Sequence, residues 1–306
     1  MREQNQAMAI RIGTSEHDGT FHSQGRALKV VLDRQPLLAP IEVLTADTAS
    51  VENANRLHAD EISFGFMAAN WIGRAKKGEA PFRNPIDIRM AAPMNAGPLF
   101  FIVRAESPIR SVADLRGRRV VLGPETSGMV QHAHTIFGVL GLPFSEFTPV
   151  YLDFEAGADE LARGTVDAQL QCPIPNKVMS ALSEQCDIRV LPYAPGQLET
   201  LLGAVSFYRR VVMRKGALRG LDADVAQPAV VNILATHART SEATVRDAVS
   251  AIVANAAELG RINPLFAGLG ELFQPLKADG AKALEFGGVA LHPGAARAYR
   301  EAGLLL

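Results

Sequence analysis

Residues 10–28 read IRIGTSEHDGTFHSQGRAL and divide into an apolar start, a glycine-containing turn and an amphipathic segment. The alternating start predicts a strand, and the spacing of Phe21, Leu28 and the apolar residues at 31 and 32 predicts a helix that ends before Pro36. A strand over 41–44, a helix over 50–57 and a strand over 61–67 follow. Strands that alternate with helices in this way predict a βαβαβ unit and a parallel sheet.

The rest of the chain repeats this alternation. We expect strands at 86–92, 99–103, 119–122, 150–154, 166–171, 188–192 and 229–236. Helices are expected at 127–140, 157–163, 176–184 and 245–259, and Ser111 and Asp114 fit a capping box for a short helix. These elements predict an α/β fold of two lobes, each a mostly parallel sheet flanked by helices, joined by two crossing strands. Lobe 1 is expected to be discontinuous, over 1–101 and 228–306, and lobe 2 to span 102–227.

Composition and charge narrow the class of protein. The 306 residues are 48% hydrophobic, and 31 basic against 32 acidic side chains give a net charge of -1. This balance does not indicate a partner with strong charge, such as nucleic acid or a membrane surface. The sequence has no apolar stretch near the roughly 18 residues of a spanning helix, so we expect no integral membrane protein.

The N-terminal residues bear on the location of the protein, whereas the two cysteines do not settle it. Residues 1–9 carry no hydrophobic segment of a secretory signal, so we expect either the mature form of a periplasmic protein or a cytoplasmic one. Cys172 and Cys186 flank a predicted helix, which separates them too far for a disulfide.

The common catalytic and cofactor motifs are missing. The sequence has no phosphate-binding or dinucleotide-binding glycine loop, no His-Glu-x-x-His and no Gly-x-Ser-x-Gly. His132 and His134 stand two residues apart on a predicted helix, where they point in roughly opposite directions and cannot share a metal ion. We therefore expect no metal and no cofactor.

The turns after the predicted strands carry the chemistry that remains. In open α/β sheets, ligands bind beyond the carboxyl ends of the strands, where helix N-termini offer unpaired N–H groups to anions. Small polar residues fill these turns, and four nearby aromatic residues, Phe21, Phe66, Trp71 and Phe207, could wall a pocket. The candidates are Ser15, His17, Gly19, Thr20, Thr48, Ser50, Asn70, Asn95, Thr126, Ser127 and Gly128, with Phe21 and Phe207 as the aromatic residues. Simple capping of a helix is the alternative role for Thr126 and Ser127.

Several segments resemble one protein family in collinear order. IRIGTSEHDGTFHSQGRAL, SVENANRLHADEISFGFM (50–67), SPIRSVADLRGRRVVLGPETSG (107–128), LARGTVDAQLQ (161–171) and LHPGAARAYREAG (291–303) resemble the TAXI-type solute receptors of TRAP transporters. The resemblance implies the type II fold of periplasmic binding proteins, in which a small carboxylate or amino acid is held between two lobes and delivered to the permease subunits of the transporter. It carries ligand-binding roles to Gly19, Thr20, Phe21, Ser50, Asn53, Thr126, Ser127 and Gly128.

The first turn departs from the family pattern. Receptors of this type usually have two glycines followed by paired tyrosines, whereas this chain has Asp18, Gly19, Thr20, Phe21 and His22. The identity of the ligand therefore cannot be transferred. An enzyme on the same scaffold, similar to a decarboxylase or a cofactor-biosynthesis enzyme, is the alternative. In that case His17 and Asp18 are the candidate acid and base, with Glu16 or Cys172 assisting.

Overall fold

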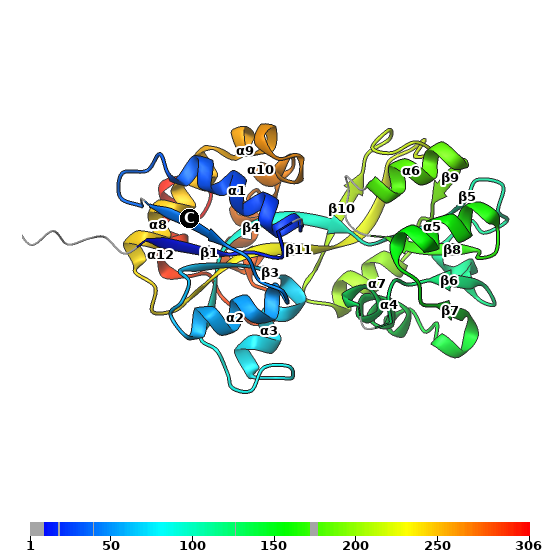
Figure 1. The fold of residues 1–306 in the computed structure, drawn as a ribbon, viewed down its shortest axis with the longest axis horizontal. Helices are drawn as coiled ribbons and strands as arrows, with labels where there is room; N and C mark the ends of the chain where they lie inside the picture. Colours follow the sequence, from blue (N-terminus) through cyan, green and yellow to red (C-terminus); the bar gives the residue numbers. More distant parts are fainter. Residues whose placement is uncertain (1–8, 18, 39, 126, 172–176) are drawn as a thin grey trace, which may run out of the picture. The chain divides into compact units, whose positions relative to one another are not determined.

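The computed structural model describes residues 9–17, 19–38, 40–125, 127–171 and 177–306, and the chain forms two compact units (Figure 1). Unit 1 comprises Met1–Ala96 and Val231–Leu306, and unit 2 comprises Gly97–Val230. The chain passes from one unit into the other within two strands, β4 (Ile88–Pro98) and β11 (Val225–His237). Unit 2 is thus one continuous insertion into unit 1.

The sheet of unit 1 has the strand order β2-β1-β3-β11, and β4 also pairs with β11. Its first strands are β1 (Ile10–Gly13), β2 (Ile41–Leu44) and β3 (Phe64–Ala68). β1 runs parallel to both β2 and β3, whereas β11 is antiparallel to β3. The carboxyl ends of β1, β2 and β3 therefore lie together along one edge of the sheet, the edge at which these strands end.

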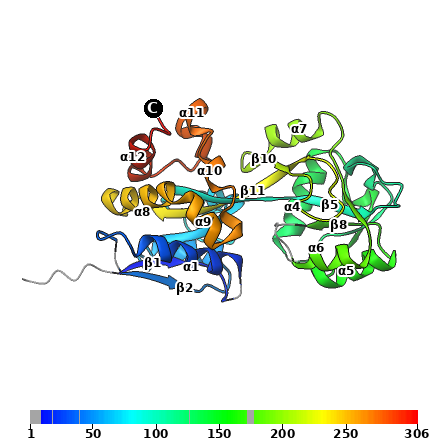
Figure 2. The same cartoon turned by 90° about the horizontal axis from the view of Figure 1, so that it is seen from above.

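Helices cover both faces of this sheet. Figure 1 shows α1 (Thr20–Leu32) on one side of the strands and α2 (Ser50–His58) with α3 (Ala69–Lys77) on the other. The C-terminal part adds α8 (Glu242–Ala254), α9 (Ala256–Ile262), η3 (Pro264–Phe266), α10 (Leu269–Leu272), α11 (Leu276–Asp279), η4 (Gly280–Leu284) and α12 (Pro293–Glu301). α12 lies against α8 (Figure 2), and a Cβ at Gly294 would come within 2.3 Å of the Glu242 carbonyl oxygen. Glycine thus permits this close helix contact.

The helix predicted over 245–259 is wrong in its continuity. It is divided into α8 and α9 at Asn255, whose backbone leaves the helical region with φ -111° and ψ 20°. The Asn255 Nδ2 atom donates to the Ala251 carbonyl oxygen, 2.8 Å away. The Ala251 carbonyl oxygen also accepts from the Asn255 N–H at 3.1 Å, so the side chain adds a second hydrogen bond at the point where α8 ends and α9 begins.

The sheet of unit 2 has the order β7-β6-β8-β5-β9. Its strands are β5 (Phe100–Arg104), β6 (Arg119–Val121), β7 (Thr148–Val150), β8 (Ala168–Gln171) and β9 (Ile188–Val190), while β10 (Tyr208–Met213) pairs with β11. β6, β7 and β8 are parallel, and β5 runs antiparallel to β8 and β9.

Strand periodicity builds two hydrophobic cores in unit 2. Phe101 and Val103 belong to one core, while their neighbours Phe100 and Ile102 belong to the other. The first core is covered by α4 (Gly128–Val139) and α7 (Gln197–Ala204), and the second by α5 (Phe154–Arg163) and α6 (Lys177–Gln185). Because successive side chains of a strand point to opposite faces, an unbroken apolar run indicates a sheet covered on both sides.

Local hydrogen bonds decide where short elements begin. The capping box at Ser111 is confirmed, and it opens η1 (Val112–Leu115); a second short turn is η2 (Phe144–Glu146). The strand predicted over 150–154 is wrong at both bounds, because β7 spans Thr148–Val150 and ends where the prediction begins. Asp153 accepts a hydrogen bond from the Ala156 N–H at 2.8 Å, and α5 therefore starts at Phe154.

Candidate functional site

The turn between β1 and α1 is a glycine-dependent helix start. The N-cap of α1 is Gly19, which has no side chain of its own to accept a hydrogen bond from the first turn of the helix. A Cβ at Gly19 would lie 2.2 Å from Ser15 Oγ and 2.7 Å from Glu16 Oε1, so a larger residue would displace them. Ser15 Oγ accepts from the His22 N–H at 3.2 Å, whereas the N–H groups of Thr20 and Phe21 have no partner among the described residues. These two donors, at the positive end of the helix dipole, suit an anion.

Ser50, Glu52 and Asn53 of the Ser-Val-Glu-Asn segment tie together the loops that follow three strands. Ser50 Oγ accepts from the N–H of Ala68, the last residue of β3, at 3.1 Å. Glu52 Oε2 accepts from the Asp47 N–H at 2.8 Å, in the loop after β2 that also holds Thr48. Asn53 is completely buried and donates to the carbonyl oxygens of Thr14 (2.7 Å) and Phe66 (2.9 Å). These side chains therefore hold the carboxyl edge of the unit 1 sheet in place.

Glycine makes room for the buried Asn53 amide. A Cβ at Gly13 would lie 2.3 Å from Asn53 Oδ1, and a Cβ at Gly65 would lie 3.0 Å from the Asn53 Cβ. These glycines on β1 and β3 have ordinary backbone angles, so the requirement is space rather than a positive φ. The Asn53 Oδ1 atom is buried without a hydrogen-bond partner among the described residues.

Further amides lie at the same edge of unit 1. Asn70, in the first turn of α3, has a buried Oδ1 atom that lacks a partner among the described residues. Asn95 on β4 is 7% exposed, and its Oδ1 accepts from Gln24 Nε2 at 3.1 Å and from Asn232 Nδ2 at 3.2 Å. The structure thus groups Asn95 with two amides that the sequence did not single out. Gln24 and Asn232 are 71 and 137 residues away from Asn95 in the sequence, so no local motif predicts that these amides meet.

Unit 2 presents the start of α4. Ser127 is the N-cap, and its Oγ accepts from the Val130 N–H at 3.4 Å, which is the capping role expected as the alternative. Gly128 follows at the first helical position, exposed and with no atom within 4 Å of where a Cβ would lie. Thr126 lies outside the described residues.

Phe207 belongs to an aromatic cluster with His132 of α4 and Tyr208 of β10. Its ring lies 5.0 Å from that of Tyr208 and 6.4 Å from that of His132. The His132 Nδ1 atom and the Tyr208 hydroxyl are 2.8 Å apart, which joins α4 to β10. Burial lowers the pKa of His132 to about 4, so this imidazole is neutral at physiological pH. The sequence spacing predicted that His132 and His134 cannot share a metal ion, but it gave no sign of this buried hydrogen bond.

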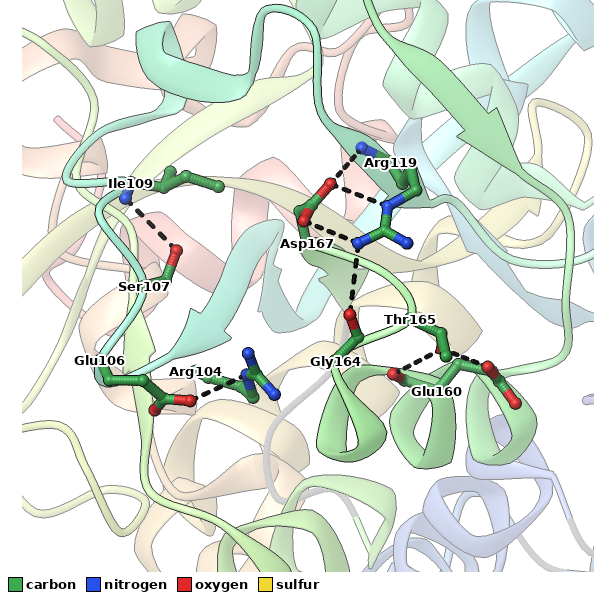
Figure 3. Close-up of polar contacts among 9 residues, drawn as sticks. All are labelled: Arg104, Glu106, Ser107, Ile109, Arg119, Glu160, Gly164, Thr165 and Asp167. Carbon is green, nitrogen blue, oxygen red and sulfur yellow. Dashed lines mark hydrogen bonds and ion pairs between the residues drawn. The ribbon is translucent and has the colours of Figure 1, made fainter.

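The LARGTVDAQLQ segment fixes the other end of the unit 2 sheet (Figure 3). The Arg119 Nε and Nη2 atoms donate to the two carboxylate oxygens of Asp167 at 3.1 and 3.0 Å, and Nη2 also donates to the Gly164 carbonyl oxygen. These hydrogen bonds from Arg119 hold the pKa of Asp167 below its usual value. Thr165 donates to the Glu160 carbonyl oxygen at the end of α5, 2.9 Å away. The polar residues of this motif thus have structural partners at the amino ends of β6 and β8.

The residues of the enzyme alternative are only partly described. His17 and His22 stack with ring centroids 5.0 Å apart. Thr14 Oγ1 donates its single proton to the Leu44 carbonyl oxygen at 2.7 Å, so its 3.2 Å contact with His22 Nδ1 makes that nitrogen the donor. Asp18 and Cys172 lie outside the described residues. Within the described part of the chain, the structure assembles no group of three His, Cys, Asp or Glu side chains that could hold a metal ion.

A family match follows the same elements from end to end. Residues 12–303 match the family described as NMT1-like. The chain belongs to the NMT1-like family. The match begins in β1 and ends just beyond α12, so it spans both units.

Solved structures with similar folds include solute-binding proteins. The periplasmic sulfonate-binding protein SsuA from Methylobacillus flagellatus KT has 13% identity and a TM-score of 0.56, with 97% of this chain and 95% of that chain covered. A TctC solute-binding protein from Polaromonas has 15% identity and a TM-score of 0.56, with 97% and 96% covered. A structure from work on glutathione import via GshT in Streptococcus mutans has 12% identity and a TM-score of 0.51, with 85% and 95% covered. These likenesses show that the fold is that of type II periplasmic binding proteins, and the first two of these structures are of binding proteins rather than enzymes.

Proposed function

We propose that this NMT1-like protein is a periplasmic receptor that captures a small organic anion, either a carboxylate or an amino acid. The observation that carries the proposal is the start of α1 at the carboxyl end of β1, where the Thr20 and Phe21 N–H groups have no partner among the described residues. The N–H groups of Thr20 and Phe21 and the close-packed Gly19 make an anion-binding turn. The family match and the binding proteins of similar fold support a binding function over catalysis.

We further propose that the receptor delivers its ligand to the permease subunits of a TRAP-type transporter. The support for this step is the resemblance of its motifs to TAXI-type receptors. The Ser-Val-Glu-Asn segment, the most specific of these motifs, has a clear structural reason here, because its side chains hold the loops around the start of α1. No helix in the described part of the chain is long and apolar enough to cross a membrane.

The test begins with gently purified full-length protein and native mass spectrometry, followed by identification of any small molecule released on denaturation. A calorimetric screen of acetate, succinate, L-glutamate and methanesulfonate follows, with methylammonium as a cationic counterpart. We expect stoichiometric binding of a carboxylate or amino acid that is recovered unchanged. Chemical turnover of a probe, or no binding to any anion by a folded sample, would refute the proposal.

Gly19→Ala tests the role of the α1 start. The added methyl group must displace Ser15 or Glu16 from the turn, so we expect anion affinity to fall by about tenfold or more, the equivalent of one lost charged hydrogen bond. Gly270→Ala, in α10 of the same unit, is the matched control because no atom lies within 4 Å of the added methyl group. Equal affinities for the two variants would remove the β1–α1 turn from the site.

A further inference from the structure

Three buried or half-buried amides of unit 1 form one hydrogen-bonded group. Gln24 lies on α1 and is completely buried, Asn95 lies on β4, and Asn232 lies on β11. The Asn95 Oδ1 atom accepts from Gln24 Nε2 at 3.1 Å and from Asn232 Nδ2 at 3.2 Å. We call Gln24, Asn95 and Asn232 the amide triad.

The amide triad fixes the direction in which Asn95 presents its amide nitrogen. A carbonyl oxygen accepts two hydrogen bonds, and both acceptor positions of Asn95 Oδ1 are used within the triad. The NH₂ group of Asn95 therefore points away from Gln24 and Asn232. Its Nδ2 atom has no partner among the described residues, yet it is not one of the buried polar atoms that lack a partner, so solvent reaches it.

The position of the triad relates this donor to the candidate site. Asn232 is paired in register with Ala68, the last residue of β3, and the Ala68 N–H donates to Ser50 Oγ at the start of α2. Phe66, two residues earlier on β3, stacks on Phe21 in the first turn of α1 with ring centroids 5.4 Å apart. Asn95 therefore lies at the sheet edge where α1 and α2 begin.

Gln24 is costly as a purely structural residue. Its Oε1 atom is sealed from solvent and has no partner in the described part of the chain. A buried acceptor without a donor destabilises the fold, and an apolar side chain of similar shape, such as Met, would avoid that cost. What an amide offers here, and Met does not, is the Nε2 donor that orients Asn95.

We propose that Gln24 and Asn232 are positioning residues that hold Asn95 as a fixed hydrogen-bond donor for an oxyanion of the ligand. This inference rests on the proposed function and deepens it, because it names the donor in unit 1 for one hydrogen bond that the ligand accepts. The ligand oxygen would be that of a carboxylate or a sulfonate, whose geometry and charge suit an amide N–H. A cationic group at this position would meet a donor and be repelled.

Side-chain amide NMR of the full-length protein tests the orientation without any ligand. The NH₂ signals of Asn95 and Gln24 are assigned from their loss in Asn95→Asp and Gln24→Met. We expect fast solvent exchange and strong broadening by a soluble paramagnetic agent for Asn95, and protection for Gln24. Protection of the Asn95 signal would overturn the inference, even for a protein that binds an anion in the calorimetric screen.

Titration of the same sample tests the oxyanion contact. Acetate and methanesulfonate should shift the Asn95 NH₂ signal, and methylammonium should not. Gln24→Met, which frees the Asn95 amide to turn, should weaken the binding of the anion by about tenfold with little loss of thermal stability. Asn255→Asp is the control and should leave the affinity unchanged, because the Asn255 amide donates to the Ala251 carbonyl oxygen at the end of α8.

The outcomes separate this inference from the proposed function. If an anion binds the protein but leaves the exposed Asn95 signal unmoved, the contact assigned here is wrong and the receptor function stands. If neither anion shifts Asn95 and the calorimetric screen finds no ligand, both fail. Unchanged affinity of Gln24→Met together with a shifted Asn95 signal would remove Gln24 as a positioning residue.

Discussion

Asn53 illustrates how one buried side chain joins two strands of unit 1. Its Nδ2 atom supplies a donor to the carbonyl oxygens of Thr14 and Phe66, at the ends of β1 and β3. Asn53→Ala would leave both carbonyl oxygens without this donor, so we expect a loss of about 2–4 kcal/mol in the free energy of unfolding, measured by urea titration. Asn55→Ala, at an exposed position of the same helix, is the control and should change stability by less than about 0.5 kcal/mol. A loss for Asn53→Ala as small as that expected for Asn55→Ala would show that Asn53 does not stabilise the sheet edge.

His132 makes the stability of unit 2 depend on pH. Burial lowers its pKa from 6.5 to about 4, so the unfolded chain takes up a proton at a higher pH than the folded protein does. This contribution is fully present above pH 6.5 and is lost as the pH falls toward 4, by about 3 kcal/mol in total. Burial also lowers the pKa of His237 and His292, so the effect is measured as a difference between proteins.

Chemical denaturation of the wild type and His132→Gln between pH 7.5 and 4 isolates this contribution. The variant should lose less stability than the wild type as the pH falls, while His134→Gln, an exposed histidine on the same helix, should follow the wild type. If the free energy of unfolding fell equally with pH in all three proteins, His132 would not be the cause of the pH dependence.

At the scale of elements, apolar period and turn residues predict most of the strands and helices. The period of Phe21 and Leu28 predicts α1, and the uninterrupted run before Arg104 predicts β5 because both of its faces are covered. The prediction at 150–154 extends the strand past Val150 into α5, whose start is set by the hydrogen bond from the Ala156 N–H to Asp153. The prediction at 245–259 misses the break at Asn255, where the backbone leaves the helical region. Hydrophobic period does not report such local hydrogen bonds.

The candidate site is predictable from sequence only in its loops. Positions after parallel strands are visible in the order of elements, which gives Gly19, Ser50 and Ser127. The amide triad is not visible, because it joins residues 24, 95 and 232 through the sheet topology. The ligand-binding roles assigned from the sequence remain predictions, and the structure gives Asn53 and Ser127 structural hydrogen bonds as well.

At the scale of the whole molecule, unit 2 is organised like an autonomous domain. Its two hydrophobic cores are built from residues between Leu99 and Val225, all within the single segment Gly97–Val230. Unit 1, in contrast, needs two chain segments, because β11 and α8 to α12 follow the insertion. A segment of 134 residues is large enough to bury a stable core by itself.

We therefore expect residues 97–230, expressed alone, to fold with a single cooperative thermal transition followed by circular dichroism. Phe101→Ala in this fragment should lower its stability by about 3–5 kcal/mol, since Phe101 is completely buried and its ring lies 5.3 Å from that of Phe137. Val212→Ala, at a 40% exposed position of β10, is the control and should have a much smaller effect. A fragment that melts without a transition, or one that is insensitive to Phe101→Ala, would mean that these cores need residues of unit 1 to form. Cooperative melting would instead establish that the insertion between β4 and β11 folds as a domain of its own.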